Sequence, residues 1–479
     1  MLRTALLVAF LFPCTAAAQD ASALLKRASA AIGADDVKTL RYSGTGMAGQ
    51  FGQAYEAGKA WPRLTLLSYA RTVDYANGAF REDIVRTRAE PTGGGAVPLT
   101  GEQKLSQFVS GSHAWNVVGP APAPAVIALA PRIHDLWTTP HGVIKAAQKN
   151  NATVEWRTVG GKELAAVSFT EPGRFTATAY LNNEYLVERI ESRFPSPVLG
   201  DTASVTLFEG WRQFGNLRFP GRIRQTQGGF PTLDLEVKEV QAGVAADIQV
   251  PPNVSGFGER VAAENPAPGV WYLAGASHHS VAIEMKDHMI VIESPLYDGR
   301  ALPMLETADN LVHGKKVRYV VNSHPHFDHA GGLRTAAARG ATIVVAANAK
   351  DYFAKALAAP SKISPDLLAK SGKKGKVMGV GAKHVFKDAT RTVEIHSIAG
   401  GVHANGFLMA YLPKERLLVE ADAYTPLAPN APAPSPANAN NVNLVENVER
   451  LKLDVDRILP LHGRIVPMGE LYRTIGKPR

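Results

Sequence analysis

The sequence is almost free of cysteine, and Cys14 is the single one among its 479 residues. It lies in an N-terminal segment with one basic residue, Arg3, an apolar stretch over residues 5–12, and three alanines that end at Ala18. This pattern is typical of a secretory signal peptide, so we expect residues 1–18 to be removed after Ala18. The remaining chain would then have no disulfide and no thiol chemistry, which suits a periplasmic or secreted protein. A lipoprotein signal that uses Cys14 is the alternative.

Several other features are missing after this segment. No later apolar run is long enough to cross a membrane, and neither a glycine-rich phosphate loop nor a dinucleotide-binding fingerprint occurs. The formal net charge of +9 is compatible with nucleic acid, but the one dense basic cluster has no interleaved aromatic residues and predicts a solvated loop. That cluster consists of Lys370, Lys373, Lys374 and Lys376. We therefore predict a small-molecule substrate, with a mild preference for anionic ones, and neither a nucleic-acid partner nor an integral membrane span. The sequence does not define the oligomeric state.

The N-terminal half is rich in short alternating runs that predict strands. Segments such as 177–180 alternate apolar and polar residues, and the intervals between them have hairpin lengths. In this half, helical spacing is confined to residues 21–32, which are followed by a glycine, and to residues 131–149. We therefore predict an antiparallel β-rich accessory domain with two helices over residues 19–250. Proline-rich ends mark a linker over residues 251–268, and a second domain follows over residues 269–479.

The chemistry of the sequence is concentrated in one turn, which reads Ser-His-Pro-His-Phe-Asp-His-Ala-Gly-Gly from Ser323 onwards. It follows an apolar strand over residues 317–321 and precedes a short helix over residues 333–339. In this turn, two histidines spaced two apart on an extended segment project to the same side, and an Asp-His pair follows where the chain bends. The four residues are His324, His326, Asp328 and His329. Imidazoles and a carboxylate in one open turn indicate a catalytic zinc-type site.

With this His-x-His-x-Asp-His turn the sequence resembles the metallo-β-lactamase-fold hydrolases over its C-terminal half. The resemblance implies three more ligands after later strands, and the matching positions are His403, Asp422 and His462. It also implies that the first zinc ion takes His324, His326 and His403, and that the second takes Asp328, His329 and His462. Asp422 would then bridge the two ions. Mixed strands and helices in this order fit an α+β fold in which the C-terminal part is a four-layer αββα sandwich.

The resemblance implies hydrolysis by a hydroxide that bridges two zinc ions, with Asp328 and Asp422 as the catalytic carboxylates. True metallo-β-lactamases place cysteine or serine at the position of Asp422, whereas thioesterases, lactonases and phosphodiesterases of the family have aspartate. We therefore expect cleavage of an ester, thioester, lactone or amide. Candidate substrate residues are Tyr424, Asn405 and His279, each of which is also compatible with a structural role.

Three alternatives stay open at this point. The same site would also suit a phosphodiesterase or a β-lactamase. A non-catalytic periplasmic protein that binds metal or ligand is a second alternative, although a complete set of seven ligands argues against it. Flavin-diiron relatives are the third, but they generally carry glutamate where this chain has His326, and no flavin module is present.

Overall fold

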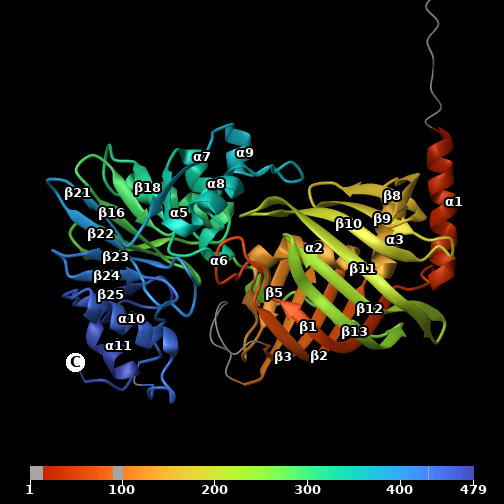
Figure 1. The fold of residues 1–479 in the computed structure, drawn as a ribbon, viewed down its shortest axis with the longest axis horizontal. Coiled ribbons are helices and arrows are strands. Elements are labelled where there is room, and N and C mark those ends of the chain that lie inside the picture. Colours follow the sequence, from red (N-terminus) through yellow and green to blue (C-terminus); the bar gives the residue numbers. More distant parts are fainter. Residues whose placement is uncertain (1–14, 90–100, 430, 479) are drawn as a thin grey trace, which may run out of the picture.

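The computed structural model describes residues 15–89, 101–429 and 431–478, with side chains from Ala21 onwards. Figure 1 shows two parts side by side, a curved sheet with α1 to α3 and a second part built on two smaller sheets. The fold is therefore a strand-rich α+β fold with a large antiparallel sheet. The predicted signal peptide lies largely outside the described residues, as does Cys14. None of the helices in the described ranges combines the length and the hydropathy needed to cross a bilayer.

The first sheet has 13 strands in the order β6-β5-β4-β3-β2-β1-β13-β12-β11-β10-β9-β8-β7. Its strands are β1 Thr39–Gly49, β2 Arg63–Asp74, β3 Ala79–Arg88, β4 Gln103–Ser110, β5 His113–Val117, β6 Ala123–Pro124, β7 Thr153–Val159, β8 Lys162–Glu171, β9 Phe175–Leu181, β10 Val187–Ser196, β11 Gly200–Phe214, β12 Leu217–Gln227 and β13 Phe230–Ala242. Neighbouring strands such as β1 and β2 run antiparallel. The sheet curves around the helices, and its inner side chains form one apolar core with them.

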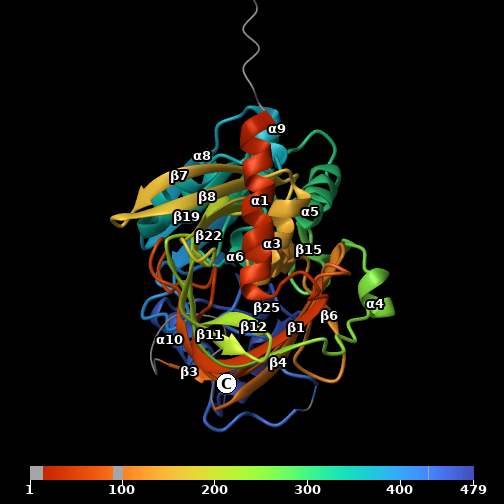
Figure 2. The same ribbon diagram turned by 90° about the vertical axis from the view of Figure 1, so that its right-hand side faces the viewer.

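Three helices fill the hollow of this sheet. They are α1 Thr15–Ile32, α2 Leu129–Trp137 and α3 Pro140–Lys149, and α1 lies against α3 (Figure 2). Leu25, Ala28 and Ile32 of α1 share one helix face and are buried in the core. The predicted end of this helix is confirmed, and the helix extends before residue 21 to Thr15, the first described residue, through an alanine-rich stretch with high helix propensity.

The prediction of one helix over residues 131–149 was wrong, because the segment breaks at two threonines. Thr139 is extended, as a residue that precedes proline prefers to be, and its side chain accepts a hydrogen bond from Gly142 N. Thr139 is therefore the N-cap of α3, and Pro140 takes the first helical position, where its missing N–H costs nothing. The accessory part consequently has α2 and α3 where one helix was expected.

The second part contains two mixed sheets. The larger runs β14-β15-β16-β17-β18-β19-β20 and the smaller β21-β22-β23-β24-β25-β26. The strands are β14 Ala262–Ala267, β15 Val270–Ala274, β16 Ser280–Glu284, β17 Met289–Ile292, β18 Val317–Val321, β19 Thr342–Ala346, β20 Lys376–Val380, β21 Lys383–Lys387, β22 Thr392–Ser397, β23 Leu408–Leu412, β24 Leu417–Glu420, β25 Arg457–Pro460 and β26 Val466–Pro467. β17 to β20 pair in parallel, and so do β24 and β25.

Helices accompany both sheets of the second part. They are α5 Asp298–Asn310, α6 Phe327–Ala330, α7 Leu333–Arg339, α8 Lys350–Ala358, α9 Leu367–Ser371, α10 Ala439–Arg450 and α11 Met468–Thr474, with a short 3-10 turn at Ala347–Ala349. The short helix α4 Pro252–Ser255 instead contacts β5 and β6 of the first sheet, and a 3-10 turn at Val126–Ala128 precedes α2. Ile283 and Val321 of the larger sheet and Ile395 and Val419 of the smaller sheet belong to one apolar core. The two sheets therefore pack on each other.

Two segments differ from the sequence-based expectation. The predicted linker over residues 251–268 contains α4 and β14. β14 pairs with β15 and extends the second sheet, whereas α4 contacts β5 and β6 of the first sheet. The lysine-rich segment is not a plain loop, because β20 begins at Lys376 and pairs with β19. β14 is rich in alanine and mostly exposed, and β20 contains a glycine and only one fully buried side chain, so neither strand has the apolar alternation that would reveal it in the sequence.

Candidate metal centre

The histidine-rich turn connects the end of β18 to α7 and has a short helix of its own, α6. His324 and His326 lie on the extended segment before α6, whereas Asp328 and His329 lie within it. The change from extended to helical backbone therefore turns the second pair to a different side from the first. The turn needs its Gly-Gly end, because a Cβ atom on Gly331 would lie 1.8 Å from the carbonyl oxygen of Leu296. This close approach fixes the turn against the segment that follows β17.

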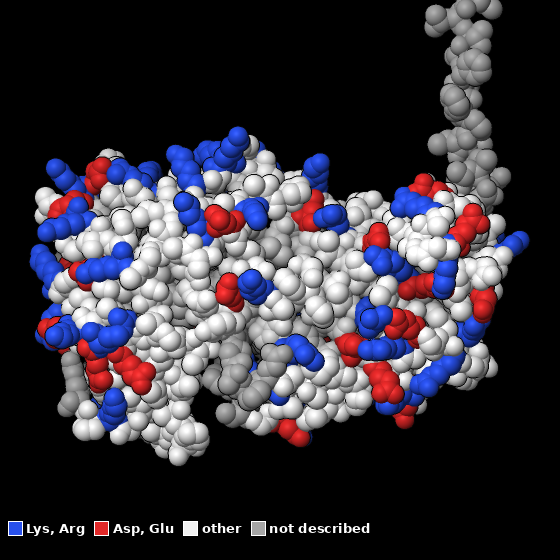
Figure 3. Space-filling model, viewed as in Figure 1, with Lys and Arg blue, Asp and Glu red and all other residues white. Residues whose placement is uncertain are grey.

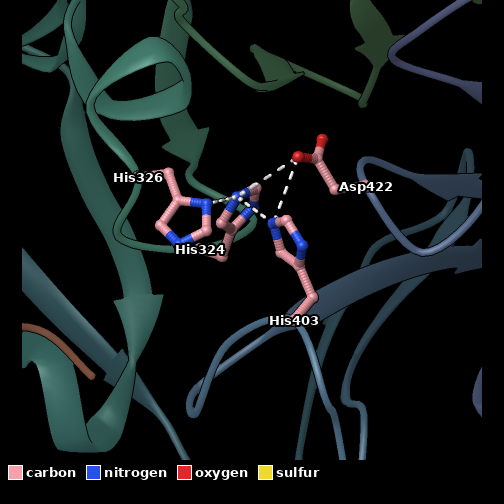
Figure 4. Close-up of side chains that lie close together, drawn as sticks. All are labelled: His324, His326, His403 and Asp422. Carbon is pink, nitrogen blue, oxygen red and sulfur yellow. Dashed lines mark hydrogen bonds and ion pairs between the residues drawn. The ribbon is translucent and has the colours of Figure 1, made fainter. Parts of the chain in front are cut away.

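The structure brings all seven predicted ligands together at the ends of strands. His403 follows β22, Asp422 follows β24 and His462 follows β25, while the other four ligands follow β18. Nε2 of His324 lies 3.0 Å from Nδ1 of His326 and 3.2 Å from Nε2 of His403 (Figure 4). Nε2 of His462 lies 3.3 Å from Nε2 of His329. The nitrogens therefore converge in two groups.

Asp422 lies between the two nitrogen groups and directs a different oxygen to each. Its Oδ2 is 3.1 Å from Nε2 of His403, and its Oδ1 is 2.9 Å from Nε2 of His329 and 3.0 Å from Nε2 of His462. Oδ2 of Asp328 lies 3.8 Å from Nε2 of His329, on the side of the second group. One carboxylate is thus placed where it can contact two neighbouring cations.

The donor set fits zinc in both type and spacing. A tetrahedral zinc ion about 2.0–2.1 Å from its ligand nitrogens keeps these nitrogens about 3.3 Å apart. The observed separations between ring nitrogens are 3.0, 3.2 and 3.3 Å, and His324, His326, His403 and Asp422 together satisfy the geometry of a candidate cation site. Neutral imidazole and ionised carboxylate are the forms that coordinate metal ions. His278, His329 and His462 form a second group of this kind, in which His278 stands and Asp328 does not. The residues present therefore offer two neighbouring candidate cation sites.

The electrostatics of the site are those of a cluster that holds a proton when no metal ion is bound. Burial alone would lower the pKa of His329, but the charges of Asp422 and Asp328 hold it well above its usual range, so this ring would release a proton on binding a metal ion. Burial, reinforced by the neighbouring His403, lowers the pKa of His326 to about 3, so its ring is neutral. Burial alone would raise the pKa of Asp422, but the charge of His329 and hydrogen bonds from three histidines hold it well below its usual range. Burial alone would also raise the pKa of Asp328, but the charge of His329 and a hydrogen bond from His278 hold it well below its usual range. Both carboxylates are therefore ionised.

A buried carboxylate behind the ligands, Glu293, orients one histidine of each group. Its Oε2 accepts a hydrogen bond from Nδ1 of His329 at 2.9 Å and another from Oγ of Ser323 at 2.5 Å. Ser323 Oγ in turn lies 2.9 Å from Nδ1 of His324. Glu293 has a φ of 72°, a strained backbone conformation of the kind that concentrates at functional sites. Such outer acceptors fix the ring orientation of ligand histidines.

The candidate substrate residues lie apart from the ligand cluster or serve other contacts. Tyr424 is fully buried, and its hydroxyl lies 3.5 Å from Oγ1 of Thr474 in α11, away from the ligands. Nδ1 of His279 accepts a hydrogen bond from Gly275 N, and burial lowers the pKa of this ring to about 4. Asn405 is exposed and binds the carboxylate of Glu56 in the N-terminal part.

Three residues of the site were not among the predicted site residues. His278 donates from Nε2 to Oδ2 of Asp328 at 3.3 Å, and its ring centroid lies 4.4 Å from that of His462. Gln53 donates from Nε2 to Oδ1 of Asp328 at 2.9 Å. Glu293 is the third, and its position directly after the apolar strand β17 was an available signal. His278 was visible as a neighbour of His279, but nothing in the sequence indicates which of the two faces the site.

A buried cluster of imidazoles and carboxylates at the strand ends of an α+β domain is typical of a metal-binding centre. Residues 236–459 match the family model described as the metallo-beta-lactamase superfamily. The C-terminal half of the chain belongs to this superfamily. Its membership and the ligand geometry support a metal-dependent hydrolase.

Several solved structures are similar to part of the chain. A metallo-beta-lactamase from Pontibacter korlensis is 16% identical, with 45% of this chain and 97% of that chain covered and a TM-score of 0.34. The DIM-1 metallo-beta-lactamase exposed to ceftazidime is 13% identical, with coverage of 46% and 95% and a TM-score of 0.34. TMB-1 is 13% identical, with coverage of 46% and 96% and a TM-score of 0.34. No curated protein matches the chain.

Proposed function

We propose that the protein is an exported hydrolase that uses two zinc ions to cleave an ester, thioester, lactone or amide bond. The observation that carries this proposal is the placement of Asp422, whose two oxygens lie against two different groups of histidine nitrogens. His324, His326 and His403 would hold one ion, and Asp328, His329 and His462 the other. For the C-terminal part we propose the four-layer order αββα, which the core shared by its two sheets supports.

In the proposed hydrolysis, the metal ions and the carboxylate of Asp328 have different roles. When bound, a zinc pair polarises the carbonyl group and lowers the pKa of a water molecule. Asp328 is ionised and held by Gln53 and His278, so its carboxylate is placed to take a proton. The water oxygen forms a bond to the carbonyl carbon, the bond to the leaving group breaks, and the proton passes from Asp328 to the leaving group.

A hydrolysis panel on the full chain tests this function. We expect zinc-dependent turnover of at least one of a 4-nitrophenyl ester, a lactone, a thioester and an anilide, in preference to bis(4-nitrophenyl) phosphate and a chromogenic β-lactam. Chelation should abolish the turnover, because the polarising charge is lost, and zinc should restore it where magnesium does not. If zinc-loaded protein hydrolysed none of these substrates, the non-catalytic alternative would replace the proposal.

Export is supported by the features of residues 1–18 described above. Peptide-end sequencing of the protein recovered from a periplasmic fraction tests this part of the proposal. Gln19 as the first residue agrees with cleavage after Ala18, whereas retention of Met1 would contradict it.

A further inference from the structure

The connector between β1 and β2, residues 50–62, joins the N-terminal sheet to the metal centre. The carbonyl oxygen of Gly52 accepts a hydrogen bond from Phe327 N at 3.0 Å, next to the contact of Gln53 with Asp328. The carbonyl oxygen of Tyr55 accepts one from Asn405 N at 2.6 Å, two residues after His403. The connector therefore contacts two of the four loops that carry the predicted ligands, and the site is completed by a segment from the other half of the chain.

A cavity of about 480 Å³ lies where these two halves meet. Its walls come from the inner face of β1 to β4 and from α2. Phe327 and Asp328 of the histidine-rich turn also line it. A cavity of this size is within the range that holds small-molecule ligands. A ligand in it would therefore extend from the N-terminal sheet to the carboxylate of Asp328.

Part of the cavity wall is apolar. Leu66, Ile84, Leu105 and Phe194 contribute apolar side chains, all buried. The charged residues Glu82 and Asp135 on the wall are already satisfied, Glu82 by Arg71 and Asp135 by amide hydrogen bonds from Gln225 and Gln227. These carboxylates are consequently committed to protein partners.

Two arginines of the wall lack a carboxylate partner among the described residues. Arg132 is 6% exposed and donates only to neutral acceptors, the carbonyl oxygens of Phe108 and Trp115 and Oδ1 of Asn116. Arg86 donates from Nε to Oε1 of Gln103 at 2.7 Å. Burial lowers the pKa of Arg132 to about 10 and also lowers that of Arg86. The charge of Glu82 acts in the opposite direction on both and offsets only part of this effect, so both guanidinium groups carry a desolvation cost. An anionic ligand would offset this cost.

We propose that this cavity is the substrate-binding site of the hydrolase, and that its substrate is an amphiphilic molecule with an anionic group. The anionic group pairs with Arg86 and Arg132, the apolar part packs on Leu105 and Phe194, and the bond to be cleaved lies at Asp328. The inference rests on the proposed function, since it assigns a substrate class to the same metal centre. Figure 3 shows acidic and basic side chains interspersed over one outer face of the molecule.

Calorimetric titration of the zinc-loaded full chain tests the substrate class with octanoate and octanol as probes. We expect octanoate to bind at least about tenfold more tightly than octanol, because charge-assisted hydrogen bonds form with the two guanidinium groups. Arg86→Gln and Arg132→Gln should each remove most of this preference, and Arg86→Lys should keep it. Arg81→Gln is the matched control, because Arg81 lies on the opposite face of the same strand and pairs with Asp83.

Two results would overturn the assignment. One is equal affinity for octanoate and octanol in the wild-type protein. The other is a preference that Arg86→Gln leaves unchanged, which would place the carboxylate on the zinc ions instead of the cavity wall. Arg86 is half-buried and its side chain makes one hydrogen bond, so we expect Arg86→Gln to fold. This variant therefore distinguishes the two binding positions of the carboxylate even if Arg132→Gln fails to fold. Because binding is measured without turnover, a failure here is distinct from a failure of the hydrolysis panel.

Discussion

Replacing Asp422 by alanine lowers kcat/KM by at least about a thousandfold, the equivalent of roughly 4 kcal/mol of lost transition-state stabilisation. The reason is the position of the carboxylate, whose Oδ2 serves one group of nitrogens and whose Oδ1 serves the other. Alanine removes a ligand from both proposed ions at once. It also leaves the imidazoles of His329 and His462 without their common partner. Steady-state kinetics on the best substrate of the hydrolysis panel measures the effect.

The control for this variant is Asp454→Ala. Asp454 is an exposed carboxylate that pairs with Arg416 at the surface, and its removal should leave kcat/KM within about twofold. Circular dichroism and the thermal midpoint show whether Asp422→Ala remains folded. A folded variant that retained more than a tenth of the wild-type kcat/KM would contradict the bridging role of Asp422.

Replacing Glu293 by glutamine has the second-largest expected effect, a loss of about 10- to 100-fold in zinc affinity. Glutamine keeps the size of the side chain but removes the charge that accepts hydrogen bonds from His329 and Ser323. Because Ser323 also contacts His324, the change disturbs one ligand in each group. Competition with a chromogenic zinc chelator measures the affinity, and kcat/KM at limiting zinc should fall in parallel.

Glu284→Gln provides a matched comparison, since Glu284 lies on the neighbouring strand β16 and pairs with Lys315 outside the centre. Its zinc affinity should equal that of the wild-type protein. Unchanged zinc affinity in a folded Glu293→Gln variant would show that the ligand histidines keep their orientation without this carboxylate. In that case the strained backbone of Glu293 would need another explanation.

The ligand cluster was predictable because its signals are local. His324, His326, Asp328 and His329 lie within six residues of one another, directly after a buried strand, and the metal turn forms where it was expected. His403, Asp422 and His462 each follow a short strand, so the resemblance to a known family identified them by position. Apolar strands and a dense histidine motif are properties of short segments, so they can be recognised in the sequence before the tertiary structure is known.

The contacts that complete the site could not be predicted, because they join distant segments. Gln53 and Asp328 are 275 residues apart in the sequence, and only the docking of the two halves brings them together. Tyr424 illustrates the reverse case, since its position two residues after Asp422 indicated the site, but tertiary packing directs its ring to α11. The sequence likewise could not show which of His278 and His279 contacts the site. In the structure His278 contacts Asp328, whereas His279 contacts Gly275.

The central claim of a paired zinc centre is tested most directly by the metal content of the purified full chain. Inductively coupled plasma mass spectrometry on protein dialysed after growth in zinc-replete medium should find close to two zinc ions per chain, and Asp422→Ala should hold substantially less. This result is expected because two groups of nitrogens share Asp422. Less than about half an equivalent of any metal in the wild-type protein would contradict the paired centre and, with it, the proposed hydrolase.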